Sequence, residues 1–228
     1  MPGTIGIISG LKRELRCLGL LRPPNTLTFA AAGSPDRAYA RAQGWIAANR
    51  IKALMSFGLC GGLDPALASG TLIAAHEIVL PEGGSWRFDE RWARAIAARV
   101  PGTRIAPILG VDTAAITVEA KAALFAQHKA DAIDMESRGV AEAAREASLP
   151  FVALRAVADP ADRMLPPAAL QGINAHGRLR PFRVLFGLLA RPGDFLALVS
   201  LAKEAARGYE ALAGAVKKGA ASPDLIPR

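Results

Sequence analysis

Short apolar runs rich in β-branched residues alternate with amphipathic stretches over the first 160 residues of the chain. The apolar runs are typical of buried strands, and Gly or Pro ends most of them. The sequence therefore predicts strands at 4–9, 27–32, 53–57, 71–80, 104–111, 132–135 and 151–158. The stretches between them predict helices at 11–15, 36–49, 89–100, 119–128 and 137–147.

Strands that alternate with helices predict an α/β fold with a central mixed sheet flanked by helices on both sides. The run at 151–158 is the most convincing buried strand of the set. No internal repeat or low-complexity linker precedes residue 175. We therefore expect residues 1–175 to form a single domain.

The character of the chain changes after residue 176. From there to the end, nine Lys and Arg stand against four Asp and Glu, and the apolar run 182–189 is flanked by arginines. Pro192-Gly193 breaks the chain before a predicted long helix whose apolar residues recur every 3.6 positions: Leu198, Leu201, Ala205, Tyr209, Leu212 and Val216. Residues 176–228 are thus predicted to form a basic, apolar helical extension packed on the same domain, and 182–189 is a candidate for peripheral contact with an anionic membrane.

Composition limits the classes of function. Hydrophobic residues make up 51% and charged residues 21% of the 228 positions, which is typical of a globular protein. Every apolar run is interrupted well short of the ~20 residues that a membrane span needs. The start of the chain lacks a basic n-region, and two cysteines make no disulfide framework, so we expect a cytoplasmic location.

The charge and the spacing of residues also limit which partners and metals the protein is expected to bind. The net charge is +8, but the basic residues are not interleaved with stacking aromatics, so no nucleic-acid partner is expected. No pair of Cys and His residues has the spacing of zinc ligands, so no metal is expected.

Four places near predicted strand ends carry residues suited to chemistry, since ligands of α/β sheets gather at the carboxyl ends of strands. The first is Gly58-Leu59-Cys60-Gly61-Gly62, whose glycines let backbone amides approach a ligand. A plain tight turn is the alternative. The spacing fits neither a dinucleotide fingerprint nor a P-loop.

Two further places carry carboxylates. Asp134 and Glu136 flank Met135 at a strand end, and side chains alternate along a strand, so the two acids face the same way. Such a pair raises the pKa of one member or binds hydroxyl groups, unless both acids are simply solvated. Asp159 directly follows a buried strand and precedes Pro160; burial would raise its pKa and suit it to donate a proton, while a turn cap is the alternative.

The fourth place is Glu14, just beyond the glycine that ends the first strand. Alone, such a residue is more often a solvated acid in the first turn of a helix. Glu14 becomes a candidate only in combination with the other three places.

Taken in order, these elements resemble the superfamily of purine nucleoside phosphorylases and methylthioadenosine/adenosylhomocysteine nucleosidases. The resemblance covers about residues 4–165 and rests on four motifs: Ile5-Gly6-Ile7-Ile8 with Glu14, Gly58-x-x-Gly61-Gly62, Asp134-Met135-Glu136-Ser137, and Arg155-Ala156-Val157-Ala158-Asp159. The loop from Gly58 to Leu63 and the basic, apolar C-terminal extension look most like the hopanoid-associated phosphorylases.

This resemblance implies a three-layer nucleoside phosphorylase-like fold, with residues 1–175 as the catalytic domain. It implies cleavage of the N-glycosidic bond of an adenine nucleoside, with lipid-linked adenosylhopane, in hopanoid biosynthesis, as the leading substrate. The alternative is a nucleosidase that hydrolyses methylthioadenosine or adenosylhomocysteine, and a catalytically silent nucleoside-binding protein is a third reading. The resemblance also implies a homo-oligomer and no cofactor.

Roles for individual residues follow from the same resemblance. Asp159 would protonate the leaving purine at N7, Glu136 would hold the ribose hydroxyls and favour the sugar cation, and Glu14 corresponds to the acid that activates water in the nucleosidases. The residues expected to line the base, the anomeric face and the ribose are Gly58, Leu59, Cys60, Gly61, Met135 and Ala158.

Two departures from the hydrolytic relatives leave the nucleophile open. Leu59 and Ala158 stand where those relatives usually have serine, which removes two hydroxyl groups and makes inherited methylthioadenosine hydrolysis doubtful. Retention of Glu14 fits water. Phosphate as a co-substrate would need cations, and the candidates for binding it are Lys12, Arg13, Arg37 and Arg87.

Overall fold

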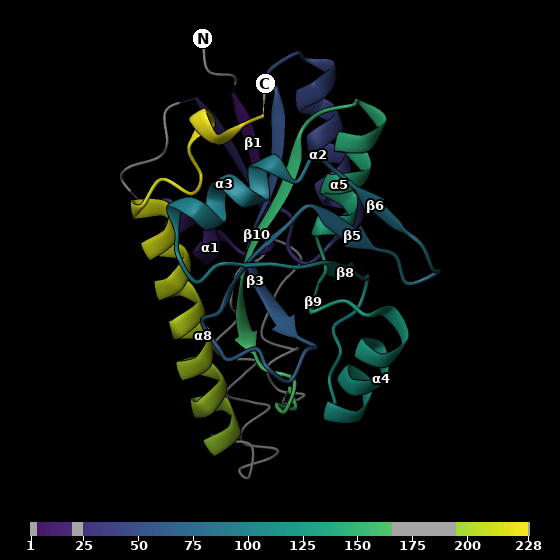
Figure 1. Cartoon of the computed structure of the whole chain (residues 1–228), viewed down its shortest axis with the longest axis vertical. Coiled ribbons are helices and arrows are strands. Elements are labelled where there is room, and N and C mark those ends of the chain that lie inside the picture. Colours follow the sequence, from purple (N-terminus) through teal and green to yellow (C-terminus); the bar gives the residue numbers. More distant parts are fainter. Residues whose placement is uncertain (1–3, 20–24, 166–194, 228) are drawn as a thin grey trace.

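A mixed sheet forms the centre of the computed structural model, which describes residues 4–19, 25–165 and 195–227 (Figure 1). Its strands are β1 (Ile5–Ser9), β2 (Thr26–Ala30), β3 (Ala53–Gly62), β4 (Leu72–Ala75), β5 (Glu77–Val79), β6 (Ser85–Arg87), β7 (Arg104–Ile105), β8 (Ile108–Gly110), β9 (Ala132–Asp134) and β10 (Phe151–Asp159).

The long strand β3 organises the sheet. One edge of β3 pairs with β10 in parallel along most of its length, and the other edge pairs first with β1 and then, at Gly61 and Gly62, with antiparallel β9. The order across the sheet is β6-β5-β8-β9-β3-β10-β4-β7, with β2 beyond β1. The carboxyl ends of β1, β3 and β10 therefore meet near β9.

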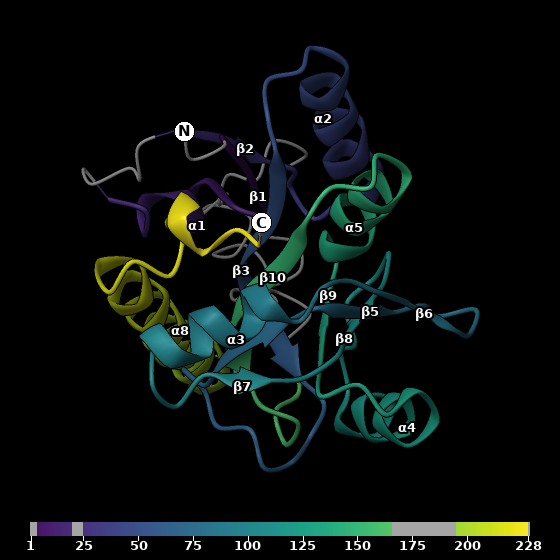
Figure 2. The ribbon, with the colours of Figure 1, turned by 45° about the horizontal axis from the view of Figure 1, so that its top comes forward.

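Helices cover both faces of this sheet (Figures 1 and 2). They are α1 (Lys12–Arg16), α2 (Pro35–Ala47), α3 (Arg91–Arg99), α4 (Val118–His128), α5 (Ser137–Glu146) and α8 (Phe195–Lys217), with a short 3-10 helix η2 (Pro223–Leu225). One apolar core unites α2 and α5 with the sheet, and a second core unites α3 and α8 with the opposite face. The predicted three-layer α/β fold is thus confirmed.

Several predicted boundaries are wrong. The strand predicted at 53–57 continues to Gly62, so the glycine segment lies within β3 and is no simple turn. The predicted strand 71–80 divides at His76 into β4 and β5, because the chain changes its neighbours from β10 to β8. The predicted strand 104–111 divides near Pro107, which has no N–H to donate to a ladder. Strand β6 was not predicted at all.

The C-terminal helix packs against β10 and β3, as the periodicity predicted. Its buried side lies slightly off the expected stripe and comprises Glu204, Gly208, Leu212 and Ala215. The segment 182–189 and the proposed division at 175/176 lie outside the described residues, so both stay predictions. No helix in the described ranges is long and apolar enough to cross a bilayer.

The contact between α2 and α5 generates a test of the packing. A Cβ on Gly139 of α5 would lie 2.0 Å from the carbonyl oxygen of Pro35, a backbone atom at the start of α2. We expect Gly139→Ala to lower the free energy of unfolding by about 1–3 kcal/mol, measured by urea denaturation, because the two helices must separate.

Gly44→Ala is the matched control. Gly44 is exposed on α2, with nothing within 4 Å of a Cβ placed there. This variant should be stabilised by about 0.5–1 kcal/mol, since alanine restricts the unfolded chain and suits a helix better. Equal effects of the two substitutions would contradict the close approach of the helices.

Candidate active site

A cavity of about 740 Å³ lies where the carboxyl ends of β1, β3, β9 and β10 converge. Three carboxylates singled out in the sequence, Glu14, Glu136 and Asp159, line it together. The lining also includes Leu59, Cys60, Gly61, Met135 and Ala158. Gly58 is the one predicted site residue that does not line the cavity.

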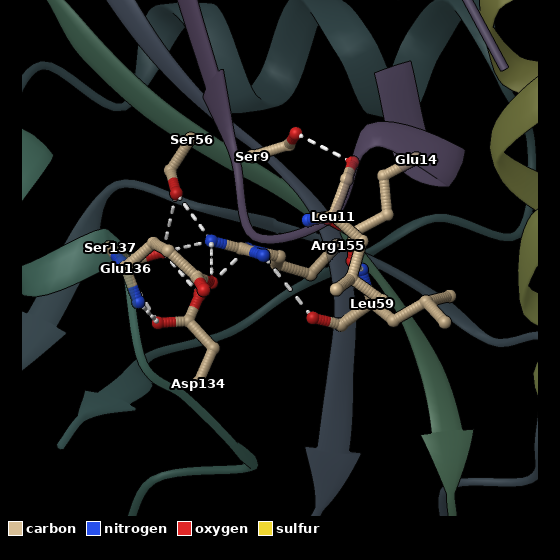
Figure 3. Close-up of polar contacts among 9 residues, drawn as sticks. All are labelled: Ser9, Leu11, Glu14, Ser56, Leu59, Asp134, Glu136, Ser137 and Arg155. Atoms are coloured by element: carbon tan, nitrogen blue, oxygen red, sulfur yellow. Dashed lines mark hydrogen bonds and ion pairs between the residues drawn. The ribbon is translucent and has the colours of Figure 1, made fainter. Parts of the chain in front are cut away.

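Buried Arg155 on β10 holds one side of the site together (Figure 3). Its Nε lies 2.6 Å from Oδ2 of Asp134, and its Nη2 donates to the Ser56 hydroxyl at 2.6 Å. Nη2 also lies 3.3 Å from Oε2 of Glu136, and Nη1 donates to the carbonyl of Leu59 at 3.2 Å. A guanidinium removed from water is costly unless it is paired, and here its pairing fixes two acids and one strand relative to one another.

Asp134 is fully occupied by structural contacts. Besides Arg155 it accepts the amides of Ser137 at 2.9 Å and Glu136 at 3.3 Å, and it accepts the Ser137 hydroxyl. The two acids do face one guanidinium, as predicted, but the predicted reason is wrong: β9 ends at Asp134, and Glu136 is the N-cap of α5. Both are buried, so the alternative of solvated acids is wrong.

Both acids of this pair line the cavity, and Glu136 is the one whose carboxyl also lies beside Gly10. Burial, helped by the nearby charges of Glu14 and Asp134, raises the pKa of the Glu136 carboxyl to about 8 against the opposing effect of Arg155. A Cβ on Gly10 would lie 2.5 Å from Oε1 of Glu136. The glycine after β1 is therefore required to leave room for the carboxyl group.

Glu14 is buried rather than solvated, although it lies in the first turn of α1. Its Oε2 accepts the amide of Leu11 at 2.6 Å, and its Oε1 accepts the amide of Leu59 at 2.8 Å. Burial raises its pKa, and Arg155 opposes that effect. A Cβ on Gly58 would lie 2.6 Å from the Glu14 carboxyl carbon, so Gly58 makes room for this acid instead of touching the cavity.

Asp159 ends β10 on the other side of the cavity and is 8% exposed. Burial raises its pKa, and the ammonium group of Lys121, 2.7 Å from Oδ2, opposes the effect. Sequence reasoning missed both Lys121 and the central role of Arg155. A lysine within an ordinary helical pattern carries no signal of burial, whereas an arginine inside the apolar run 151–158 did carry one.

Among the residues that the structure describes, the wall of the cavity is rich in acids and has no basic side chain. Five acids line it, and no Lys or Arg of the described segments does. Of the residues considered for phosphate, Arg13 lies over the Tyr209 ring and Arg87 pairs with Glu77 at 3.0 Å, away from the cavity; Lys12 and Arg37 do not line it either. Across the described chain, no group of three or more His, Cys, Asp and Glu is arranged to hold a metal ion.

Buried carboxylates lie where strand ends of a mixed sheet converge, and comparison with known proteins assigns this arrangement to a family. The family model of the phosphorylase superfamily matches residues 16–184. The chain therefore belongs to the phosphorylase superfamily and is an enzyme of the nucleoside phosphorylase or N-glycosyl hydrolase type. A search of curated protein sequences finds no significant match.

Solved structures with the same fold include two from Helicobacter pylori. Futalosine hydrolase matches with a TM-score of 0.68 and 17% identity, covering 95% of this chain and 98% of the other. A point mutant of methylthioadenosine/adenosylhomocysteine nucleosidase with 5'-methylthioadenosine in its active site matches with a TM-score of 0.68 and 16% identity, covering 95% and 99%. The nucleosidase of Colwellia psychrerythraea in complex with adenine has a TM-score of 0.67 at 14% identity, covering 96% of each chain. At these identities the likeness concerns the fold.

The raised pKa of Glu136 generates a prediction about stability. In the folded state this carboxyl keeps its proton up to about pH 8, whereas its ordinary pKa is 4.5. The folded state therefore binds more protons between these values, and the associated stability is full below pH 4.5 and lost as pH rises through 8. We expect the free energy of unfolding to fall between about pH 5 and pH 8 by an amount on the order of a few kcal/mol.

Glu136→Gln should flatten this dependence in urea denaturation at a series of pH values, because glutamine binds no proton. The control is Glu210→Gln, which removes an exposed acid from α8 and should leave the slope unchanged. A Glu136→Gln curve parallel to that of the wild type would show that this carboxyl is ionised in the folded protein throughout the range.

Proposed function

We propose that the protein cleaves the N-glycosidic bond of an adenine nucleoside. The observation that supports this most is the shared cavity of Asp159, Glu136 and Glu14, which come from three separate parts of the chain. Displacement of adenine needs a proton donor at the base, a group that binds the sugar and stabilises positive charge there, and, for hydrolysis, a base that takes the proton of the attacking water. One acid is available for each of these tasks.

Asp159 is the proposed proton donor. Adenine is a poor leaving group as an anion, and a proton delivered to N7 as the bond breaks turns it into a neutral one. Burial supports this role because it raises the pKa of Asp159 and so favours the protonated form. The expected result is a donor that holds its proton closer to neutral pH than a solvated aspartate does.

Glu136 is the proposed partner of the ribose. Its carboxyl would bind the sugar hydroxyls, and in its ionised form it would stabilise the positive charge that builds at the anomeric carbon, an interaction stronger in the transition state than in the ground state. Arg155 and the backbone amide of Gly33 both donate to this carboxyl group and so fix its orientation. Met135, beside it in the cavity wall, is proposed to pack against the sugar ring.

The wall of the cavity supports a substrate with a bulky apolar group on the 5′ carbon. Its volume lies in the upper part of the range for ligand pockets, about 300–1,000 Å³. Apolar side chains dominate the lining away from the acids, among them Leu11, Val111, Ile116 and Leu165. Adenosylhopane, a lipid-linked adenine nucleoside of hopanoid biosynthesis, remains our leading substrate.

Hydrolysis is the second candidate reaction, and the charge of the cavity favours it. A phosphate dianion among five acids, with no basic side chain of the described residues in the wall, would be repelled by each ionised carboxylate. A water molecule carries no charge and is not repelled, and Glu14, which lines the cavity, is the proposed acceptor of its proton. Methylthioadenosine and adenosylhomocysteine are the alternative substrates for such a nucleosidase.

The first functional test removes the proton donor. We expect Asp159→Asn to lower kcat for adenine release by two to four orders of magnitude while substrate still binds, since general acid catalysis contributes about 10²–10⁴-fold. Asp162→Asn, which changes an exposed aspartate in the same turn, is the matched control and should retain activity. Unchanged turnover in Asp159→Asn would mean that another group protonates the base.

The second test separates substrates and nucleophiles. Adenine release is measured by absorbance with adenosylhopane, methylthioadenosine and adenosylhomocysteine, each with and without inorganic phosphate. We expect adenosylhopane to react fastest. A rate independent of phosphate would establish hydrolysis, and a strict requirement for phosphate would establish phosphorolysis. Fast turnover of methylthioadenosine alone would replace the leading substrate, and no release from any nucleoside would leave a silent binding protein.

A further inference from the structure

Lys121 is the sole buried residue of α4, and its side chain is fully removed from solvent. The ammonium group reaches the turn that follows β10. There it contacts four oxygens: Oδ2 of Asp159 at 2.7 Å, and the carbonyls of Pro160 at 2.8 Å, Arg163 at 3.0 Å and Asp159 at 3.2 Å. The three N–H groups of an ammonium are thus fully used.

A buried ammonium is costly and is retained where a specific geometry depends on it. Three carbonyl contacts alone would indicate a device that stabilises the turn. The shortest contact, however, is to a carboxylate oxygen of the proposed proton donor itself. This choice of partner is not required to hold a turn, and it points to a role in the chemistry of that carboxyl group.

We infer that Lys121 is a positioning residue for Asp159: by binding Oδ2 it fixes the carboxyl group so that Oδ1 is the oxygen that carries the proton to the base. The inference rests on the proposed function, in which Asp159 acts as the acid. No side chain of the described residues donates a hydrogen bond to Oδ1. The contact with Lys121 therefore makes the two oxygens of the carboxyl group inequivalent.

The same contact also changes the pKa of Asp159. Burial raises the pKa of Asp159, and Lys121 offsets part of that rise, whereas Glu204 on α8 adds to it. The titratable and charged groups around Asp159 are Lys121 on α4, Glu204 on α8, Cys60 on β3, and Asp162 and Arg163 in the turn. An acid whose pKa lies far above the working pH gives up its proton poorly, so the ammonium keeps Asp159 useful as a donor.

The turn that holds Asp159 is fixed from a second side as well. The guanidinium of Arg163 pairs with buried Glu204 at 2.6 Å, while the carbonyl of the same Arg163 accepts from Lys121. Because α8 also secures the turn, loss of Lys121 should release the carboxyl group without unfolding the end of β10. This makes substitution of Lys121 informative about chemistry.

The experiment compares Lys121→Met with the wild type on two substrates over a series of pH values. One substrate is the best adenine nucleoside from the assays above, and the other is p-nitrophenyl riboside, whose leaving group departs as a stable anion without being protonated. We expect kcat/KM for the nucleoside to fall at least tenfold at neutral pH and that for the nitrophenyl riboside to change less than threefold. The basic limb of the nucleoside profile should move to higher pH, because Asp159 loses the cation that lowers its pKa.

Two comparisons keep the outcome decisive. Lys129→Met removes an exposed lysine just after the same helix and should leave both rates and the pH profile unchanged. In an Asp159→Asn background, Lys121→Met should cost nothing further, since Lys121 acts through that carboxyl. If Lys121→Met does not fold, Lys121→Gln, which keeps a donor for the carbonyls but no charge, takes its place.

The inference is overturned if both substrates lose activity equally, or if the basic limb stays where it is in the wild type. Failure of the proposed function is a different result: the wild type would release adenine from no nucleoside. In that case the carboxyl titration of Asp159, followed by ¹³C NMR in the wild type and in Lys121→Met, still tests the ion pair. An identical titration in the two proteins would refute it.

Discussion

Everything at this site depends on one guanidinium that has been taken out of water. Arg155 stands inside a fully buried strand, where an unpaired charge would cost several kcal/mol, so the surrounding chain must supply carboxylates and carbonyls around it. Asp134 meets this requirement at close range and Glu136 at longer range, while Leu59 supplies a carbonyl from β3. Since these partners come from β3, from the end of β9 and from the start of α5, the ion cluster fixes the sheet and the cavity with the same contacts.

The cluster also explains why neighbouring acids differ in character. Both carboxylate oxygens of Asp134 contact Arg155 or the start of α5, whereas Oε1 of Glu136 lies beside Gly10. Asp159, on the far side, has the ammonium group of Lys121 as its counter-ion. Burial raises the pKa of Glu136 and Asp159 alike, but the cation beside each acid is different, and such separation of environments allows carboxylates of one pocket to take separate roles.

Local pattern in the sequence predicts the type of nearly every helix and strand, and it brings Glu14, Glu136 and Asp159 forward as candidates. It fails where the deciding contacts are distant along the chain. The pattern ends the strand 53–57 at the glycines because a run of them locally favours a turn, yet pairing with β9 and β10 continues the ladder through Gly62. Lys121 lies 38 residues from Asp159, and nothing in its own helix distinguishes it from a solvated lysine. Such residues become visible only when the fold brings the two segments together.

The segment between β8 and α4 has a consequence of a different kind. It forms one wall of the cavity, from Val111 to Ile116, but belongs to neither β3 nor β10, and α4 behind it buries only Lys121. This wall is anchored by Val111 and Ala115, which are buried in an apolar cluster with Leu109 and Ile133, and it takes no part in the ion pairs of Arg155. The shape of the cavity and the geometry of the ion cluster are thus set by separate parts of the chain, so a substitution at 112–114 would reshape the cavity without touching the contacts of Arg155.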